Sequence, residues 1–155
     1  MRIRSVSFNN RRKGFRVRTA KSELWYPYAK LHGTPRGAPT VVSVSADTEL
    51  AREGFTYRLD SGQEGSVHVE QVLEYNQDPA YLRDLLLYKL TLEAQKRIAS
   101  SRLSRREIIR RLGTSASQLY RLLDQTNSRK SVDQMLALLH VLDCDVDLVV
   151  RSKSA

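Results

Sequence analysis

The cations of residues 96–130 are the side chains of this chain best suited to chemistry with a ligand. This segment contains ten Lys or Arg but only two acids, Glu107 and Asp124, so its net charge is +8. Guanidinium and ammonium groups at this density are typical of proteins that bind a polyanion, because they hold phosphates through charge and donated hydrogen bonds. Charge runs also occur on ordinary solvated faces. The secondary-structure elements that carry these cations must therefore distinguish a binding surface from a solvated one.

Patterns typical of an enzyme or a metal site are absent from the sequence. His32, His68 and His140 are far apart, and none stands at a metal-ligand spacing from another His or from Cys144. There is no phosphate-binding glycine loop and no nucleophile elbow. We therefore predict a protein that is not an enzyme, with no catalytic residues, no metal and no cofactor.

The bulk composition indicates a globular protein of one domain or two small ones. The chain has 155 residues, of which 41% are hydrophobic and 28% are charged. No apolar run is long enough to cross a bilayer, so we expect no membrane partner. The single Cys144 cannot form an internal disulfide, and we see no targeting signal, so we expect a cytoplasmic location.

Helix starts near these cations are marked by three capping boxes. In such a box a Ser hydroxyl accepts the backbone N–H three residues on, while a Glu or Gln side chain there reaches back to the Ser N–H. The boxes are Ser104/Glu107, Ser115/Gln118 and Ser131/Gln134. Asp78-Pro79 marks a fourth start, and Gly113 is a stop signal. Together these signals predict four helices within residues 79–143. We expect the first to span about residues 79–100 and to be shared by the N-terminal module and the helical domain.

Gly113 stops the second of these helices, and Thr114-Ser115 is the only bridge to the third, so the two helices are joined by a tight turn. The segment Leu103–Leu123, with Ser131–Leu142 after it, resembles the Cro/lambda-repressor-like (XRE-type) helix-turn-helix family. The similarity covers roughly residues 80–143. The resemblance implies a bundle of four or five short helices in which residues 115–123 form the recognition helix.

The resemblance also implies a set of DNA-binding residues. They are Arg105, Ser115, Ala116, Ser117, Tyr120, Arg121, Arg129 and Lys130. Arg105, Arg129 and Lys130 would hold phosphates, and Arg121 would reach base edges. Leu119 and Leu122 would instead face the core. The chain departs from the family at Ala116, where Gln is frequent, and at Ile109, where a small residue is usual.

Some of these positions have a second interpretation. Arg129 and Lys130 lie in the polar loop 124–130, which fits a flexible solvated loop as well as a phosphate contact. Tyr120 is suited either to a phosphate contact or to half-buried packing. A helix-turn-helix can also be kept for packing or for docking a protein partner.

The N-terminal part, residues 1–78, is predicted to be a small β-rich α+β module. Alternating apolar residues predict strands over 3–8, 15–19, 24–28, 41–44, 55–59 and 67–69, followed by a short helix over 70–75. No internal repeat is visible. The segments Phe55–Asp60 and Val72–Asn76 resemble uncharacterised bacterial modules with antitoxin-like associations. That resemblance implies a protein partner for the module but names no chemistry.

The predicted fold class is therefore α+β, with this module and a C-terminal all-α lambda-repressor-like helix-turn-helix domain over residues 79–155. Residues 1–22 hold eight cations and no acid, whereas residues 23–78 have a net charge of −5. Three uses for the N-terminal cations stay open: contact with flanking DNA phosphates, docking of an acidic partner, or neutralisation within the module. Residues 146–151 are a candidate strand that pairs with the N-terminal sheet or with a second copy.

The sequence thus predicts sequence-specific binding of double-stranded DNA by a transcriptional regulator, a repressor. We expect a homodimer, because one recognition helix seldom discriminates a genomic site. The alternative is an antitoxin-like protein-binding module that sequesters a partner and autoregulates its operon.

Overall fold

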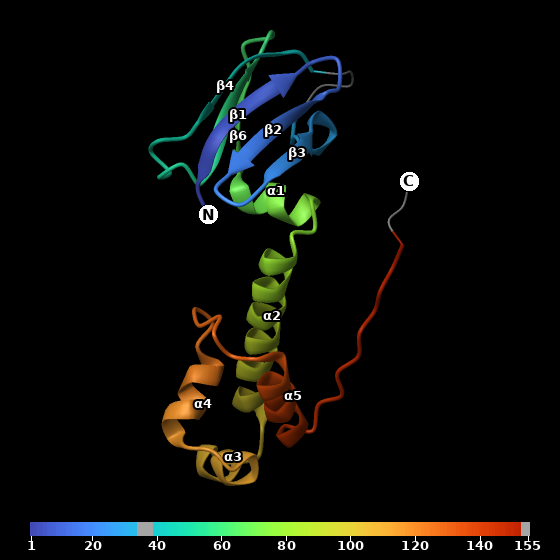
Figure 1. Cartoon of the computed structure of the whole chain (residues 1–155). Coiled ribbons are helices and arrows are strands. Elements are labelled where there is room, and N and C mark those ends of the chain that lie inside the picture. The colour runs from blue at the N-terminus through green and yellow to red at the C-terminus, as the bar shows by residue number, and fades with distance from the viewer. Residues whose placement is uncertain (34–38, 153–155) are drawn as a thin grey trace. The chain divides into compact units, whose positions relative to one another are not determined.

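The strands of this chain come first and its α-helices follow. The structure is a computed structural model that describes residues 1–33 and 39–152 (Figure 1). The chain divides into two compact units, Met1–Leu82 and Arg83–Ala155. No helix in the described part is both long and apolar enough to cross a membrane.

The first unit contains two three-stranded antiparallel sheets. The strands are β1 (Ile3–Asn9), β2 (Gly14–Thr19), β3 (Glu23–Pro27), β4 (Val41–Ala46), β5 (Gly54–Leu59) and β6 (Glu64–His68). The strand orders are β1-β2-β3 and β4-β5-β6. A 3-10 turn, η1 (Tyr28–Lys30), follows β3, and helix α1 (Val69–Tyr75) follows β6. The strands and the short helix predicted for this part of the chain are therefore present, with ends displaced by up to three residues.

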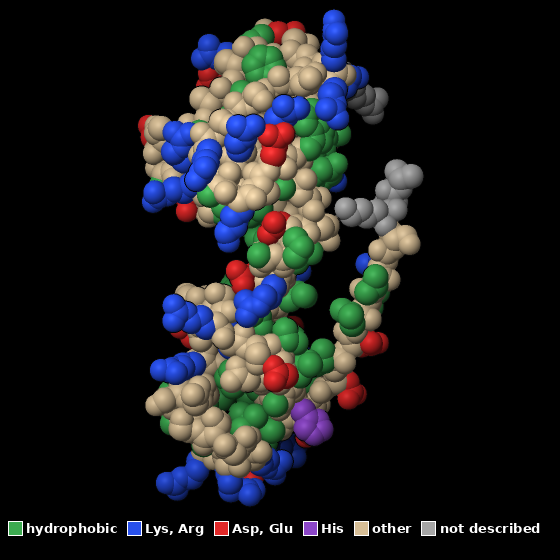
Figure 2. All heavy atoms as spheres, in the orientation of Figure 1, with side chains coloured by type: hydrophobic (Ala, Val, Ile, Leu, Met, Phe, Trp, Pro, Cys, Tyr) green, Lys and Arg blue, Asp and Glu red, His purple; other side chains and the backbone are tan. Residues whose placement is uncertain are grey.

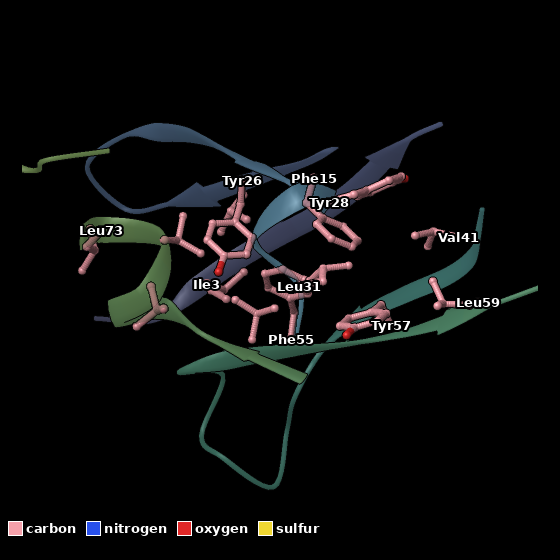
Figure 3. Packing of buried hydrophobic residues seen from close by; sticks show 14 residues of the cluster. Ile3, Phe15, Tyr26, Tyr28, Leu31, Val41, Phe55, Tyr57, Leu59 and Leu73 are labelled. Atoms are coloured by element: carbon pink, nitrogen blue, oxygen red, sulfur yellow. The ribbon is translucent and has the colours of Figure 1, made fainter. Parts of the chain in front are cut away.

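Both sheets contribute their apolar faces to one core. In β2 and in β5 the first two residues and then every second residue are buried, the alternation expected when one face of a sheet is covered. The ring centroids of Phe15 and Phe55 are 4.8 Å apart, and those of Phe15 and Tyr28 are 4.9 Å apart. Figure 3 shows these rings between the two sheets. Aromatic packing at this distance stabilises the unit beyond simple burial of area.

The two sheets are copies of one β-meander, which the sequence reading did not detect. Each ladder begins with a pair of buried residues, Ile3 with Thr19 and Val41 with Leu59, and each has a register shift directly after its first pair. Seven equivalent positions hold identical residues: Ser5/Ser43, Val6/Val44, Ser7/Ser45, Gly14/Gly54, Phe15/Phe55, Arg18/Arg58 and Glu23/Glu64. The residue pair Phe15 and Phe55 that meets in the core is one of these equivalent pairs.

The copies also share close approaches and an ion pair. A Cβ added to Gly14 would overlap the Trp25 ring, and one added to Gly54 would lie 2.9 Å from the Val67 carbonyl oxygen. Arg18 is 3.0 Å from Glu23, and the equivalent Arg58 is 2.6 Å from Glu64. The first unit is therefore an internal duplication, and each meander ends in a helical turn, η1 or α1.

The second unit is built on the long helix α2 (Pro79–Ser100), which has 22 residues. Its start is capped as predicted, since Asp78 Oδ2 accepts the Tyr81 N–H at 3.0 Å. Three shorter helices follow: α3 (Arg105–Leu112), α4 (Ala116–Leu123) and α5 (Val132–Val141). Figure 1 shows them gathered around the later turns of α2.

One apolar core joins these four helices. Its buried members are Leu87, Ala94, Ile108, Leu119, Leu122, Met135, Leu138 and Leu139. Leu119 and Leu122 face this core, as predicted. Ile109, the bulky departure noted in the sequence, is partly buried against it.

The prediction of a C-terminal all-α lambda-repressor-like helix-turn-helix domain is wrong. The described chain is α+β, with two small three-stranded antiparallel sheets and five helices, and its strands are N-terminal and central. The helices do not form a separate bundle, because α2 runs from one compact unit into the other without an internal Gly or Pro. The prediction of one long shared helix over about residues 79–100 is confirmed. The boundary between the compact units accordingly falls inside α2, after Leu82.

Residues 146–151 do not pair with the N-terminal sheet, one of the two partners predicted for this candidate strand. Pairing with a second copy stays a prediction. The described residues 144–152 have no regular structure, and they pair with no strand of either sheet. Leu148, Val149 and Val150 are 77%, 68% and 84% exposed. A strand needs a partner ladder, and one chain does not supply it here.

Candidate nucleic-acid interface

Helix α3 starts and stops where its sequence signals stand. Ser104 Oγ accepts the Glu107 N–H at 3.1 Å, which satisfies one backbone donor at the start of the helix. Gly113 ends α3 in the left-handed conformation, with φ 65°. The Thr114 N–H then donates to the Ile109 carbonyl at 3.2 Å. Because a Cβ disfavours this backbone conformation, Gly at position 113 permits the tight turn.

Helix α4 begins three residues after that glycine, at Ala116. Ser115 Oγ accepts the Gln118 N–H at 3.2 Å. Leu119 and Leu122 are 1% and 7% exposed, so they fix the inward face of the helix. The sequence predicted this helix over residues 115–123, and it spans Ala116–Leu123.

Only one of the three predicted boxes has both of its hydrogen bonds. At Ser131 the Gln134 side chain accepts the Ser131 N–H at 2.9 Å, and Ser131 Oγ accepts the Gln134 N–H at 3.3 Å. At Ser104 the return bond is missing because the Glu107 carboxylate binds the guanidinium groups of Arg110 and Arg111 instead. A complete box that the sequence reading missed starts α1, where Gln71 Oε1 accepts the His68 N–H.

The outward face of α4 carries exposed polar side chains. Ala116, Ser117 and Gln118 are exposed in its first turn, and Tyr120 and Arg121 are exposed in the next. Ser117 and Arg121 are four residues apart, so they lie on one side of the helix, opposite the buried leucines. Five of the eight predicted DNA-binding residues, Ser115 to Ser117 with Tyr120 and Arg121, are therefore exposed along this single element.

Arg105 joins this face from the first turn of α3. Its guanidinium carbon lies 5.6 Å from the centroid of the Tyr120 ring. Tyr120 is 60% exposed, so half-buried packing, one of its two interpretations, is not what the structure has. A cation over an exposed ring holds both side chains in place at a small energetic gain.

The C-terminal end of α4 is closed by side chains rather than by water. Gln95 of α2 donates to the Leu123 carbonyl at 2.7 Å, and Asn127 donates to the Arg121 carbonyl at 3.3 Å. Lys130 Nζ donates to the Leu122 carbonyl and to the Asp124 carbonyl, both at 2.8 Å. The last carbonyls of a helix have no partner within the helix, so these bonds fasten α4 to its neighbours.

The ammonium group of Lys130 therefore binds backbone carbonyls inside the protein. The residue is 4% exposed, and burial lowers the pKa of its ammonium group, an effect that the Asp124 carboxylate opposes. An ammonium at a helix C-terminus also interacts favourably with the helix dipole. Lys130 is therefore not available to bind a phosphate.

Arg129 differs from its neighbour, since it is exposed. The loop that carries it is held by several bonds: Asp124 Oδ1 accepts the Thr126 N–H at 2.9 Å, and Arg83 donates to the Ser128 carbonyl at 3.0 Å. Hydrogen bonding to the Thr126 hydroxyl lowers the pKa of Asp124. Arg129 thus projects from an ordered loop that follows α4.

The start of α3 holds cations where a helix disfavours them. Arg105 and Arg106 occupy its first two positions, both exposed, at the positive end of the helix dipole. Neither has an ion pair among the described residues. Arg106 was missed by the sequence reading, although its position at a helix start is a signal that could have found it, since breaks with local preference often mark function.

Other cations of α3 are neutralised. Glu107 binds Arg110 and Arg111, and hydrogen bonds from Arg110 and then from Arg111 lower the pKa of its carboxyl to about 2. These two arginines therefore contribute less to the field of this unit than the formal charge suggests. From Arg102 to Lys130, the exposed cations without an ion pair are Arg102, Arg105, Arg106, Arg121 and Arg129. Figure 2 shows Lys and Arg side chains over the α3 end of this unit.

In the described residues, no group of three or more His, Cys, Asp and Glu side chains is placed to hold a metal ion. Comparison of the chain with models of protein families, with curated proteins and with solved structures finds no match.

Proposed function

We propose that the chain binds double-stranded DNA in a sequence-specific manner and acts as a transcriptional regulator, a repressor. The observation that carries this proposal is the outward face of α4, where Ser117 and Arg121 are presented on a helix fastened at its C-terminal end by Gln95, Asn127 and Lys130. A rigidly held helix with a polar outward face suits the major groove, which admits one α-helix.

Each side chain in this proposal has a separate task. Arg121 reads base edges, because a guanidinium matches the two acceptors of guanine. Arg105, Arg106 and Arg129 hold phosphates on either side and set the register of α4. The Ala116 methyl group adds only an apolar contact, of the kind a thymine methyl offers.

The proposal depends on the α3–α4 pair, not on a lambda-repressor-like fold. What it needs is a protruding helix flanked by phosphate-binding cations, and both belong to the same compact unit. We also propose a cytoplasmic location, because the single Cys144 fits a reducing compartment.

The test is binding of purified full-length protein to its own promoter fragment and to sequences selected from a random pool. Arg121→Ala should cost about 1–3 kcal/mol on the selected site and relax its specificity. Arg105→Ala should weaken all duplexes alike and reduce the salt dependence of binding. Lys89→Ala, an exposed cation of α2, is the control for loss of charge. Selected-site binding that survives Arg121→Ala unchanged would refute the role given to α4.

A further inference from the structure

The internal duplication of the first unit provides a comparison between two copies of one scaffold. Residues 3–22 contain seven Lys or Arg and no acid, whereas the equivalent residues 41–63 contain two Arg and four Asp or Glu. Both segments form the same ladder with the same register shift and nearly the same burial. The scaffold therefore does not require the cations, and their presence in one copy needs another explanation.

Neutralisation within the unit does not supply that explanation. All seven cations of residues 3–22 are exposed. In the described chain their ion pairs are those of Arg16 and Arg18, at 3.2 and 3.0 Å, and both are made with the single carboxylate of Glu23. Five cations are left for solvent or for a ligand. Like charges this close repel one another, which costs stability unless an anion binds.

Three of these cations lie in the turn between β1 and β2, and hydrogen bonds fasten the backbone of this turn. Asn9 Oδ1 accepts the Arg11 and Arg12 N–H groups at 3.1 and 3.0 Å. Asn10 bonds both the N–H and the carbonyl of Val41, each at 3.0 Å, and the Lys13 carbonyl accepts the Tyr28 N–H at 2.9 Å. A turn whose backbone is fastened on both sides loses less backbone entropy on binding than a flexible charged tail does.

The exposed face of β2 continues this array. Arg16 and Arg18 alternate with the buried Val17, so both point away from the core, about 7 Å apart along the strand. Ser7 and Ser5 of β1 are their cross-strand neighbours. Guanidinium groups and hydroxyls in a row are the donors that phosphates accept. Figure 2 shows Lys and Arg side chains over the part of this unit that contains β1 and β2.

We infer that the β1–β2 turn and the outer face of β2 form a second DNA-binding surface, which contacts the phosphodiester backbone of duplex DNA without reading its sequence. An acidic protein fits this surface less well, because protein interfaces centre on buried apolar side chains. Phe8 is the one exposed large apolar side chain of residues 3–22, at 38%, and Trp25, the cross-strand neighbour of Arg16 on β3, is half-buried beside Arg12. A phosphate backbone needs only charge and donors.

The second copy indicates substitutions that the scaffold tolerates. Arg16→Thr puts in place the residue that the equivalent Thr56 already provides. Lys13 has φ 55°, a left-handed conformation that Asn adopts more readily than Lys, so Lys13→Asn keeps the turn. Arg11→Gln completes a triple variant that leaves Arg12, which stacks on Trp25, untouched. The matched control is Lys30→Gln/Lys89→Gln/Lys96→Gln, three exposed lysines outside both surfaces.

The experiment measures the affinity of the full chain for a random-sequence duplex over a range of salt concentrations. The triple variant should lower the slope of log affinity against log salt by about 2–3, since each phosphate contact contributes about 0.9. The control should leave the slope close to that of the natural chain. A slope that is unchanged in the triple variant, or equally lowered in the control, overturns the inference and leaves an acidic protein as the ligand to seek.

A second pair of measurements separates this inference from the proposed function. In the background Arg105→Gln/Arg121→Ala, sequence preference should vanish while the residual binding still falls when the triple variant is added. If the triple variant has no effect there but Arg121→Ala alone lowers selected-site affinity, the first-unit surface is wrong and the α4 assignment stands. If the triple variant lowers the residual binding there but Arg121→Ala alone leaves selected-site affinity unchanged, the first-unit surface stands and the α4 assignment is wrong.

Discussion

Replacing Lys130 by Met should destabilise the second unit by about 2–3 kcal/mol. Lys130 Nζ donates to two carbonyls at the end of α4, each at 2.8 Å, in a buried position. A hydrogen bond from a charged donor contributes about 1.5–3 kcal/mol, so two bonds give a gross loss of about 3–6 kcal/mol. Met recovers part of this loss, because it fills the space of the lysine stem and removes the cost of burying a charge.

The assay is urea unfolding of the full chain with two probes. Trp25 is the single tryptophan and lies in the first unit, so its fluorescence reports that unit, whereas circular dichroism also reports the helices of the second. With a urea dependence of about 1 kcal/mol/M for a small unit, the helical transition should move down by about 2–3 M. The fluorescence transition should stay in place, and Lys89→Met, at an exposed site on α2, should change neither.

The titration of Lys130 predicts how the stability difference between the two proteins changes with pH. Its pKa is lowered from 10.5 by burial, so as pH rises the folded state loses this proton before the unfolded state does. The neutral amine keeps two N–H donors for the two carbonyls, and the cost of the buried charge disappears. The natural chain should therefore gain stability relative to Lys130→Met as pH rises toward 10.5. Equal midpoints for the two proteins at neutral pH would refute the capping role.

Three further outcomes follow from single features of the chain. Glu107→Gln should remove a stabilisation that is fully present above pH 4.5 and lost as pH falls through about 2, because the folded pKa lies below the unfolded one; acid unfolding of both proteins measures this. Gly14→Ala should displace the Trp25 ring, which an added Cβ would overlap, and shift the tryptophan emission of the folded protein to that of a more exposed indole. Deletion of residues 146–155 should abolish a dimer in sedimentation, since exposed Leu148 and Val150 are the apolar groups that a second copy would cover; a natural chain that sediments as a monomer at all concentrations would contradict this.

Local signals in the sequence were sufficient for element ends. A Ser before an apolar run, a Gly in the turn and alternating apolar residues each act within a few residues, so α3, α4 and the strands lie close to where they were predicted. The partner of the Glu107 carboxylate could not be predicted from the sequence. Arg110 and Arg111 offered charged partners that outcompete a backbone N–H, and this choice depends on side-chain geometry.

Long-range relations were beyond the sequence reading. Lys130 looks like any loop cation until α4 and the loop after it bring two carbonyls to its ammonium. The duplication was hidden because the equivalent positions conserve burial and register more than residue type: Val17 corresponds to Tyr57 and Trp25 to Ser66. Pairing of residues 146–151 with the N-terminal sheet was wrong for a related reason: a strand needs a partner ladder, and the residue pattern of one segment does not identify that partner.

The two basic surfaces both present exposed cations on rigid elements, one on helices and the other on a turn and a strand. In the second unit, cations at the start of α3 break the helix-dipole preference, and α4 is anchored at its C-terminal end so that Arg121 is presented on a rigid helix. In the first unit, a fastened turn presents Arg11 and Arg12 on a scaffold whose other copy has lost or never had such charge. Each surface keeps local features that cost stability, and each is rigid where those features lie. Rigidity at an electrostatic cost has little value for folding alone, but it lowers the entropy lost when an anion binds.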